Sequence, residues 1–352
     1  MKEKILIVGG GLAGSILGYI LHKKYPCDLE IIDDYGNNKA SLVAAGIYNP
    51  IVFKRLVCSW KADELITCLD EFYNEIEKEL NVSFHFKKEI LKLFADDEEI
   101  NIWKKKSHHP DIKKYIQPEP ILNFREDILN EQKAFGKVIN AGNLNTSAFL
   151  SALHIYFEKQ GILTRERFDY ESLKLEADKS ISYHQKNFSK VIFCEGYRAI
   201  YNPWFNWLEF KLTKGELLTI SAPLNIEKEV INKGVFILPY GDNIYKVGAT
   251  YEWDNLDETP TEKGKNELIE KLNRLIKVPY QIISHEAGIR PTVKDRRPIL
   301  GSHPSIESML VFNGLGTKGV MLAPYFAKKL AGYIFENTRL EDEINIMRFW
   351  RG

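Results

Sequence analysis

The sequence predicts a mixed α/β protein in which a nucleotide-binding domain is interleaved with a second domain built on a largely antiparallel sheet. Three observations lead to this prediction. A glycine-rich loop follows an apolar run at the N-terminus, α/β patterns recur in the middle and at the end of the chain, and strand-rich stretches lie between them. The chain has 352 residues, of which 44% are hydrophobic and 27% charged, which is typical of a soluble globular protein with two domains.

The N-terminal strand and loop form a dinucleotide-binding fingerprint. A short apolar run leads into a G-x-G-x-x-G loop, in which Gly9 allows the tight turn and Gly11 lets the backbone approach a pyrophosphate. Gly14 lets the following helix pack closely on the strand. Leu12 and Ala13 lie at the start of that helix, whose free N–H groups attract phosphate. A Rossmann-like unit is therefore expected here, the alternative being a glycine-rich turn of an unrelated α/β protein.

The second predicted strand, residues 29–32, ends in two carboxylates, Asp33 and Asp34. Asp33 lies 24 residues after Gly9, near the offset at which an acidic residue reaches a ribose hydroxyl. The β-α-β order of residues 1–34 thus supports a dinucleotide site.

The next part of the chain is expected to form a helix and then the strands and loops of a second domain. Residues 61–80 carry apolar side chains at helical spacing, which indicates an amphipathic helix. Residues 84–135 alternate short apolar runs with charged and proline-bearing stretches, so strands and loops of a second domain are expected there. Within them, His108 and His109 are expected in a solvated loop, because no further metal ligand follows at a suitable spacing.

A new α/β unit is expected from Val138 onward, and the remaining elements follow in order. The predicted elements are a helix over 145–161, a strand over 190–194, a hairpin over 235–250, a helix carrying Leu268, Leu272, Leu275 and Ile276, a strand over 309–312 and a helix over 319–337. Pro324 is compatible with the last helix only if that helix begins near Gly319. The expected nucleotide-binding domain is therefore discontinuous, comprising 1–80, 138–208 and 288–352, and the substrate-binding domain comprises 81–137 and 209–287.

A second glycine loop lies near the C-terminus and identifies the cofactor. Residues 287–292 and 295–301 form a G-x-R-P…D-x-x-P-x-x-G stretch, and Asn313–Gly319 opens the final helix. With the N-terminal loop, these residues resemble the D-amino-acid oxidase, glycine oxidase and sarcosine oxidase family of flavoenzymes over essentially the whole chain. Four shorter segments also match that family: Ala44-Ala45-Gly46, Cys194-Glu195-Gly196, Lys214-Gly215-Glu216 and Gly248-Ala249-Thr250.

The resemblance implies that the cofactor is FAD, with its ADP part on the first loop and its flavin along the last. Asp33 would then bind the adenosine ribose. The residues expected to contact FAD are Gly9, Gly11, Leu12, Ala13, Gly14, Asp33, Asp34, Ala45, Gly46, Gly196, Arg290, Gly314, Leu315, Gly316, Thr317, Lys318 and Gly319. The sarcosine oxidase branch holds its flavin through a C-terminal cysteine. None of the four cysteines lies in that region here, so non-covalent FAD is expected. A simple turn before a helix is the alternative for 313–319.

Two cations are candidates for holding a substrate carboxylate. Arg290 has a planar, always-charged fork that suits a carboxylate, and members of the family use an arginine at this place for that task. Lys318 stands where the sarcosine oxidase branch has a lysine that helps hold the carboxylate. The alternatives are a salt bridge from Arg290 to Asp295 and a solvent-exposed Lys318.

Two positions depart from the glycine oxidase pattern. Phe236 stands where glycine oxidase carries a tyrosine over the substrate, and Thr317 stands where it has an arginine. Phe236 and Tyr251 are candidate pocket residues. These differences argue against simple glycine oxidation and leave room for a larger or different amine, or for lost activity.

The predicted function is FAD-dependent oxidation of a C–N bond in an amino acid or secondary amine that carries a carboxylate. Hydride passes to flavin N5, the imine product is hydrolysed, and oxygen or another acceptor reoxidises the flavin. Three alternatives stay open: an oxidase resembling the FAD domain of a bifunctional tRNA-modifying enzyme, an NAD-dependent dehydrogenase that uses only the first loop, and a non-catalytic FAD-binding protein.

Charge and patterning limit the partners. The 48 basic residues balance the 48 acidic ones, so no global field favours nucleic acid or anionic membranes, and a nucleic-acid partner is not expected unless a local basic patch exists. No transmembrane run, signal peptide or C-x-x-C motif is visible. The expectation is a cytoplasmic protein with reduced cysteines and a small-molecule substrate.

Overall fold

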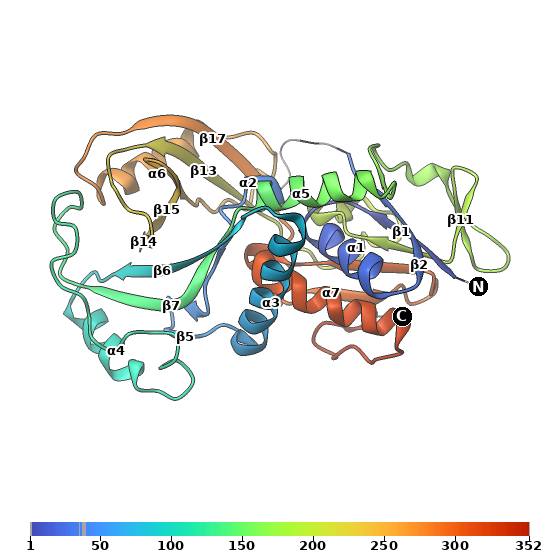
Figure 1. The fold of residues 1–352 in the computed structure, drawn as a ribbon, viewed down its shortest axis with the longest axis horizontal. Coiled ribbons are helices and arrows are strands. Elements are labelled where there is room, and N and C mark those ends of the chain that lie inside the picture. The colour runs from blue at the N-terminus through green and yellow to red at the C-terminus, as the bar shows by residue number, and fades with distance from the viewer. Residues whose placement is uncertain (1, 35, 37–39, 352) are drawn as a thin grey trace.

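The computed structural model describes residues 2–34, 36 and 40–351, whose two large sheets lie side by side (Figure 1). The first sheet has six strands in the order β18 (Ile299–Ser302), β19 (Met309–Asn313), β12 (Lys190–Phe193), β1 (Glu3–Val8), β2 (Cys27–Ile32) and β8 (Leu163–Thr164). Its pairings are parallel except between β18 and β19. The parallel centre and the strand β1 at its middle confirm the α/β prediction.

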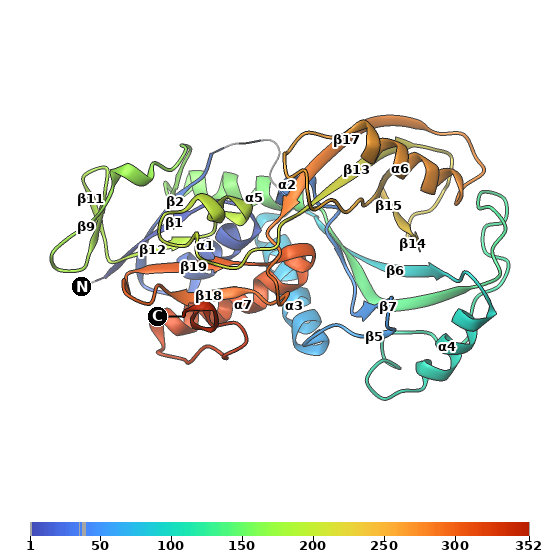
Figure 2. The same cartoon turned by 180° about the vertical axis from the view of Figure 1, so that it is seen from behind.

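Helices cover one face of the six-stranded sheet and a small sheet covers the other (Figures 1 and 2). The helices are α1 (Leu12–Lys24), α3 (Ala62–Leu80), α5 (Thr146–Lys159) and α7 (Gly319–Phe335). The small sheet comprises β9 (Leu173–Leu175), β10 (Ile181–Tyr183) and β11 (Lys186–Phe188). The six-stranded sheet is therefore buried on both faces, as a parallel sheet must be.

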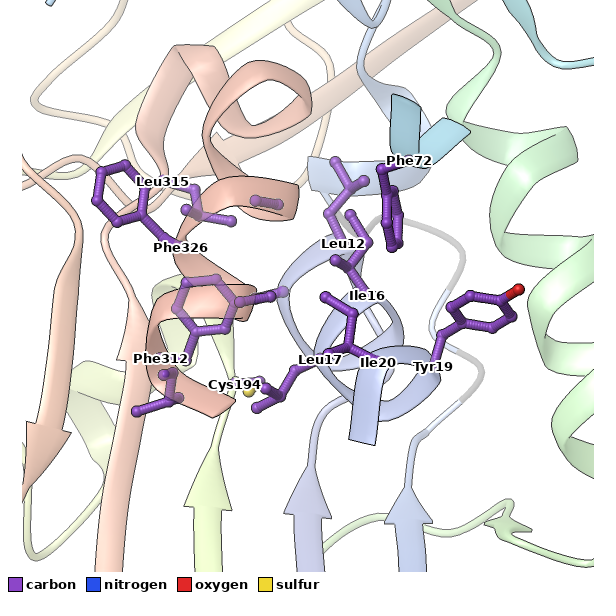
Figure 3. Packing of buried hydrophobic residues seen from close by; sticks show 14 of the residues in the cluster. Leu12, Ile16, Leu17, Tyr19, Ile20, Phe72, Cys194, Phe312, Leu315 and Phe326 are labelled. Carbon is purple, nitrogen blue, oxygen red and sulfur yellow. The ribbon is translucent and has the colours of Figure 1, made fainter. Parts of the chain in front are cut away.

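The core beneath the first glycine loop is formed by α1 and α7. Leu12, Ile16 and Leu17 of α1 pack with Phe312 and Phe326 in one buried cluster (Figure 3). Because this core fixes both helices, it also fixes the two glycine loops that precede them.

The second sheet has eight strands and is antiparallel except for one pairing, β14 with β6. Its order is β17 (Gln281–Arg290), β13 (Thr213–Ser221), β16 (Ile244–Gly248), β15 (Val235–Gly241), β14 (Glu229–Lys233), β6 (His85–Leu93), β7 (Phe135–Leu144) and β3 (Ile47–Tyr48). Helix α6 (Glu262–Asn273) packs on one face, and β4 (Ile51–Val52) pairs with β5 (Val57–Cys58) beyond β3. A largely antiparallel second sheet was predicted, and this architecture confirms it.

The predicted domain boundaries stay a prediction, but β7 bears on one of them. This strand begins at Phe135 and pairs antiparallel with β6 along its length, so residues 138–144 belong to the eight-stranded sheet. The expected start of an α/β unit at Val138 therefore falls within this strand. The unit begins with α5, where the Asn145 side chain accepts from Ala148 N.

Two α-helices were not predicted, the short α2 (Ala40–Val43) and α4 (Asp97–Ser107). Helix α4 lies within the stretch expected to hold only strands and loops, and only Trp103 and Ser107 of it are buried. It is stabilised at its ends instead. The Asp96 side chain accepts from Glu99 N, acidic residues fill the first turn and lysines the last. Helix α6 also ends at Asn273, before Leu275 and Ile276, which were expected in it.

The last helix accommodates its proline. α7 begins at Gly319, so Pro324 lies inside it, as the sequence required. Proline has no N–H to donate to the carbonyl four residues earlier. That carbonyl, Val320 O, instead accepts from the buried Tyr73 hydroxyl at 2.9 Å. In the described part of the chain, no helix is both long and apolar enough to cross a bilayer.

Candidate active site between the two sheets

A cavity of about 540 Å³ runs from the first glycine loop to the eight-stranded sheet. It brings together most of the residues that the sequence indicated. Lining it are Gly9, Gly11, Leu12, Ala13, Asp33, Asp34, Ala45, Gly46, Gly196, Phe236, Tyr251, Arg290, Leu315, Gly316, Thr317 and Gly319. Gly14, Gly314 and Lys318 do not line it.

The first glycine loop forms part of the cavity wall. Gly9 has φ +103°, and a Cβ there would lie 2.6 Å from Cys194 O, so the turn requires glycine. A Cβ on Gly14 would lie 1.8 Å from Gly9 O, which explains why Gly14 supports the loop from behind rather than lining the cavity. Helix α1 starts beside the cavity without a side-chain cap or an acidic first turn. Its N-terminus is therefore suited to an anionic group.

The two carboxylates after β2 have different partners. Asp33 accepts from Gly10 N at 2.6 Å and so also holds the glycine loop in place. Asp34 forms an ion pair with Arg198. Although burial opposes it, contacts with Tyr197 and Asp34 raise the pKa of Arg198. Both aspartates line the cavity. The assignment of Asp33 to a ribose hydroxyl stays a prediction.

The last glycine loop forms another part of the cavity wall. The Asn313 side chain donates to Gly196 O at 2.8 Å and accepts from Gly314 N, which ties β19 to the residues after β12. Gly314 has φ +76°, and a Cβ there would lie 2.6 Å from the Val293 side chain, so Gly314 shapes the turn and faces away from the cavity. Gly316 and Gly319 expose backbone beside the cavity at the start of α7.

Arg290 is the last residue of β17 and lines the cavity. Its guanidinium donates to Lys214 O and Thr250 O over 3.3–3.5 Å, which are long contacts, and packs 4.8 Å from the Tyr251 ring. Burial lowers the pKa of Arg290 from its ordinary value. No carboxylate among the described residues forms an ion pair with it. Asp295, the suggested partner, instead pairs with Arg348 at 2.7 Å.

Gly215 makes room for this guanidinium and was missed as a site residue. A Cβ on Gly215 would lie 1.9 Å from Arg290 Nη2, so the arginine lies flat across the glycine backbone. The neighbours Lys214 and Glu216 are both buried; the Lys214 ammonium donates to Asp257, and Glu216 accepts from Thr261. The Lys214-Gly215-Glu216 motif was visible in the sequence, but its relation to Arg290 depends on the pairing of β13 with β17.

Lys318 is directed elsewhere. Its ammonium donates to Ser59 Oγ, and burial, together with the charge of Arg297, lowers its pKa to about 8. It is neither exposed to solvent, as one interpretation held, nor among the residues lining the cavity. Its predicted role in holding a carboxylate has no support from this geometry.

Phe236 and Tyr251 border the part of the cavity that holds Arg290. Phe236 of β15 is paired with Gly248 in the sheet, and Tyr251 follows β16 with its ring half exposed. Lys246 of β16 is a buried lysine that does not line the cavity, and sequence reasoning passed over it because its strand reads as ordinary alternation. Burial lowers the pKa of Lys246, and its ammonium lies 4.7 Å from the Tyr240 ring centroid.

Glu195 is a second residue that the sequence did not single out by itself. It lines the cavity after β12, accepts from Asn202 Nδ2 at 2.7 Å and from the Tyr170 hydroxyl, and burial raises its pKa to about 7. No metal site competes for this region, since the described residues contain no group of three or more histidine, cysteine or acidic side chains that could hold an ion.

The cavity fits an extended dinucleotide, because both glycine loops, each followed by the N-terminus of a helix, border the same space. A family model described as FAD dependent oxidoreductase matches residues 4–333. The glycine oxidase of Pseudomonas aeruginosa is 26% identical over 121 residues, which is 34% of this chain and 33% of that protein.

Two further comparisons extend this result. The tRNA 5-methylaminomethyl-2-thiouridine biosynthesis bifunctional protein of Idiomarina loihiensis is 29% identical over 100 residues, 27% of this chain and 16% of that protein. The crystal structure of glycine oxidase from Geobacillus kaustophilus has a TM-score of 0.77 at 18% identity and covers 100% of both chains, which shows a shared fold. The matches to the first curated relatives span 33%, 39% and 36% of their lengths.

Proposed function

Since the chain belongs to the FAD-dependent oxidoreductase family, whose model matches residues 4–333, we propose that it oxidises a C–N bond of an amino acid or secondary amine carrying a carboxylate. The observation that carries this proposal is Arg290. It lines the cavity and has only long hydrogen bonds and no carboxylate partner among the described residues. A partly buried guanidinium in that state favours binding of an anionic group.

The two glycine loops would hold FAD, the cofactor of the family, at two places along the cavity. Gly9, Gly11 and the N-terminus of α1 suit the pyrophosphate. Gly316 and Gly319 suit the flavin, because their backbone is uncovered at the start of α7. When bound, FAD supplies the acceptor for the hydride equivalent that leaves the substrate carbon. We expect FAD to be held without a covalent bond.

The chain's own residues would position the amine. Arg290 would bind the carboxylate through two parallel N–H donors and so fix the orientation of the α-carbon, and such positioning supplies a large part of the rate. Phe236 and Tyr251 would border the substituent of the amine. Because Phe236 has no hydroxyl to form a hydrogen bond, that part of the pocket favours an apolar substituent of the amine over a polar one.

The first prediction concerns Arg290→Ala. We expect flavin reduction by a carboxylated amine to lose roughly 10- to 100-fold in kcat/KM, because a hydrogen bond between charged groups contributes about 1.5–3 kcal/mol. The measurement is anaerobic loss of flavin absorption with a panel of amino acids and N-methyl amines. Arg274→Ala, at an exposed arginine paired with Glu270, is the matched control.

Amines without a carboxylate separate binding from folding. Such amines should reduce the flavin of the Arg290→Ala and Arg274→Ala variants at equal rates, because only the carboxylate of a substrate contacts Arg290. The proposed function is wrong if no member of the panel reduces the flavin of the unaltered protein. The role of Arg290 is wrong if its alanine variant reacts like the Arg274 control.

A second candidate is oxidation of an amine carried by an RNA nucleotide. One of the relatives is a tRNA biosynthesis protein, although the chain spans only 16% of its length. The specific observation that favours this candidate is a cluster of exposed cations around the end of α4, which the neutral composition of the chain concealed.

A further inference from the structure

An exposed basic surface lies where the end of α4 meets the turn between β4 and β5. Two segments form it, 54–61 and 104–114, which together contain eight lysine and arginine residues and the single carboxylate Asp111. The basic surface consists of Lys54, Arg55, Lys61, Lys104, Lys105, Lys106, Lys113 and Lys114. Figure 1 shows α4 and β5 together at one edge of the molecule, beside the eight-stranded sheet.

Direct contacts hold the two segments together. The Lys106 ammonium donates to Arg55 O at 2.6 Å, and the Cys58 thiol donates to Asp111 O at 2.9 Å. Lys114 reaches Asp63 at the start of α3. These contacts join stretches more than 40 residues apart in the sequence into one surface.

Most of this charge is not neutralised. Within the described ranges, Lys114 is the member of the basic surface that forms an ion pair, and six of the eight side chains belong to exposed residues. The negative end of the α4 dipole accounts for Lys104, Lys105 and Lys106. It does not account for Lys54, Arg55 or Lys113, which lie outside the helix.

We propose that the basic surface binds the phosphodiester backbone of a nucleic acid, and that its partner is a folded RNA. Lysine predominates, and lysine is enriched where phosphates are contacted but depleted in the centres of protein interfaces, which use aromatic residues and arginine. The apolar residues exposed beside it, Val57 and Ile102, are 37% and 42% exposed, and neither is the large aromatic anchor that favours membrane insertion.

The basic surface also adjoins the wall of the cavity. Ser59, between Arg55 and Lys61, accepts from Lys318, whose neighbours Thr317 and Gly319 line the cavity. The choice of RNA over DNA rests on the second candidate function, and within it on the similarity to the tRNA biosynthesis protein. Binding of the phosphate backbone does not depend on amine oxidation, and none of the eight cations lines the cavity.

The test uses the FAD-loaded full chain and a fluorescently labelled, unmodified tRNA transcript, with binding followed by anisotropy from 50 to 200 mM salt. We expect saturable binding with a Kd of roughly 1–100 µM, which weakens steeply with salt. The triple variant Lys104→Glu, Lys105→Glu, Lys113→Glu should bind at least tenfold more weakly. Its slope of log K against log salt should be shallower by about 0.7–0.9 for each lost phosphate contact.

A matched control changes the net charge equally. Lys159→Glu, Lys174→Glu, Lys277→Glu alters three exposed lysines away from the basic surface and should bind within twofold of the unaltered protein. Equal losses in the two triple variants, or no saturable binding by the unaltered protein at 50 mM salt, would overturn the proposal.

Two further probes identify the partner. Duplex DNA bound as tightly as RNA supports the phosphodiester site and overturns the choice of RNA. Vesicles containing anionic lipid bound in place of both nucleic acids overturn the proposal. Flavin reduction by free amines, measured on the same triple variants, should be unchanged, so a failure of the proposed oxidation would be seen separately.

Discussion

At the scale of single residues, the chemistry of Arg290 is decided by its neighbours. Its sequence neighbour Asp295 could have neutralised it, but Asp295 pairs with Arg348. Gly215 has no side chain in the space that the guanidinium occupies, and the backbone carbonyls around the guanidinium accept only long hydrogen bonds from it. The residue type indicates what the group can bind, whereas its availability follows from contacts that lie far apart in the chain.

Gly215→Ala tests this arrangement. The added methyl group would collide with Arg290 Nη2, so the guanidinium must move. We expect the Kd of acetate, measured by perturbation of the flavin absorption spectrum, to rise about tenfold or more, because a charged hydrogen-bonded pair is lost. The neutral isostere acetamide should be unaffected.

The matched control for this substitution is Gly241→Ala, at a position where the nearest atom to a Cβ is 3.9 Å away. Acetate that binds the unaltered protein and Gly215→Ala equally well would show that Gly215 does not position Arg290. If acetate binds neither the unaltered protein nor Gly215→Ala, the proposed carboxylate site is wrong.

Glu195 gives a prediction for pH. Its folded-state pKa is about 7, chiefly through burial, against 4.5 for the free side chain. The folded state therefore holds a proton that the unfolded state releases, so this group makes stability fall as pH rises from 4.5 to 7. The Tm of the FAD-free protein should fall more across that window than the Tm of Glu195→Gln. Parallel Tm curves for the two proteins would contradict this assignment.

At the scale of elements, apolar periodicity does not account for every helix, and interactions at particular backbone positions account for the rest. The apolar spacing predicted α1, α3 and α5. Helices α3 and α5 each bury one stripe, whereas α1 is buried on all sides from Leu12 to Leu21. Helix α4 lacks such a stripe and depends on its Asp96 cap and its end charges, so periodicity alone could not find it. Helix α7 keeps a proline because a side chain from another helix supplies the missing donor.

A double-mutant cycle tests that last point. Tyr73→Phe leaves Val320 O without a donor and should lower the free energy of unfolding by about 1–2 kcal/mol, the cost of a buried group left unpaired. In a Pro324→Ala background the helix regains its own N–H donor, so the same substitution should cost less. Chemical denaturation of the four proteins measures the coupling, and additive losses would show that the two residues are independent.

Tyr25→Phe provides the comparison for this cycle. Its hydroxyl donates to Glu336 at 2.7 Å in an exposed place, so its loss should change stability by less than about 0.5 kcal/mol. If Tyr25→Phe lowers the free energy of unfolding as much as Tyr73→Phe does, the effect of Tyr73→Phe cannot be attributed to the proline.

At the scale of the whole molecule, the candidate site lies between two sheets that the chain visits alternately. The glycine loops come from opposite ends of the sequence, whereas Phe236, Gly215 and Arg290 come from the eight-stranded sheet. The recognisable spacing of the loops made the cofactor predictable. The discontinuous order of the strands made the domain limits hard to place, as β7 shows.

The sequence by itself determined the α/β class, the two glycine loops, the family and the candidacy of Arg290, because these depend on local spacing and residue type. Only the tertiary structure decided that Arg290 is left without an ion-pair partner in the described chain, that Lys318 turns to Ser59, and that two distant lysine-rich segments form one surface. Those outcomes depend on which strands and helices pack together. Packing is set by the burial of apolar area over the whole molecule rather than by any short motif.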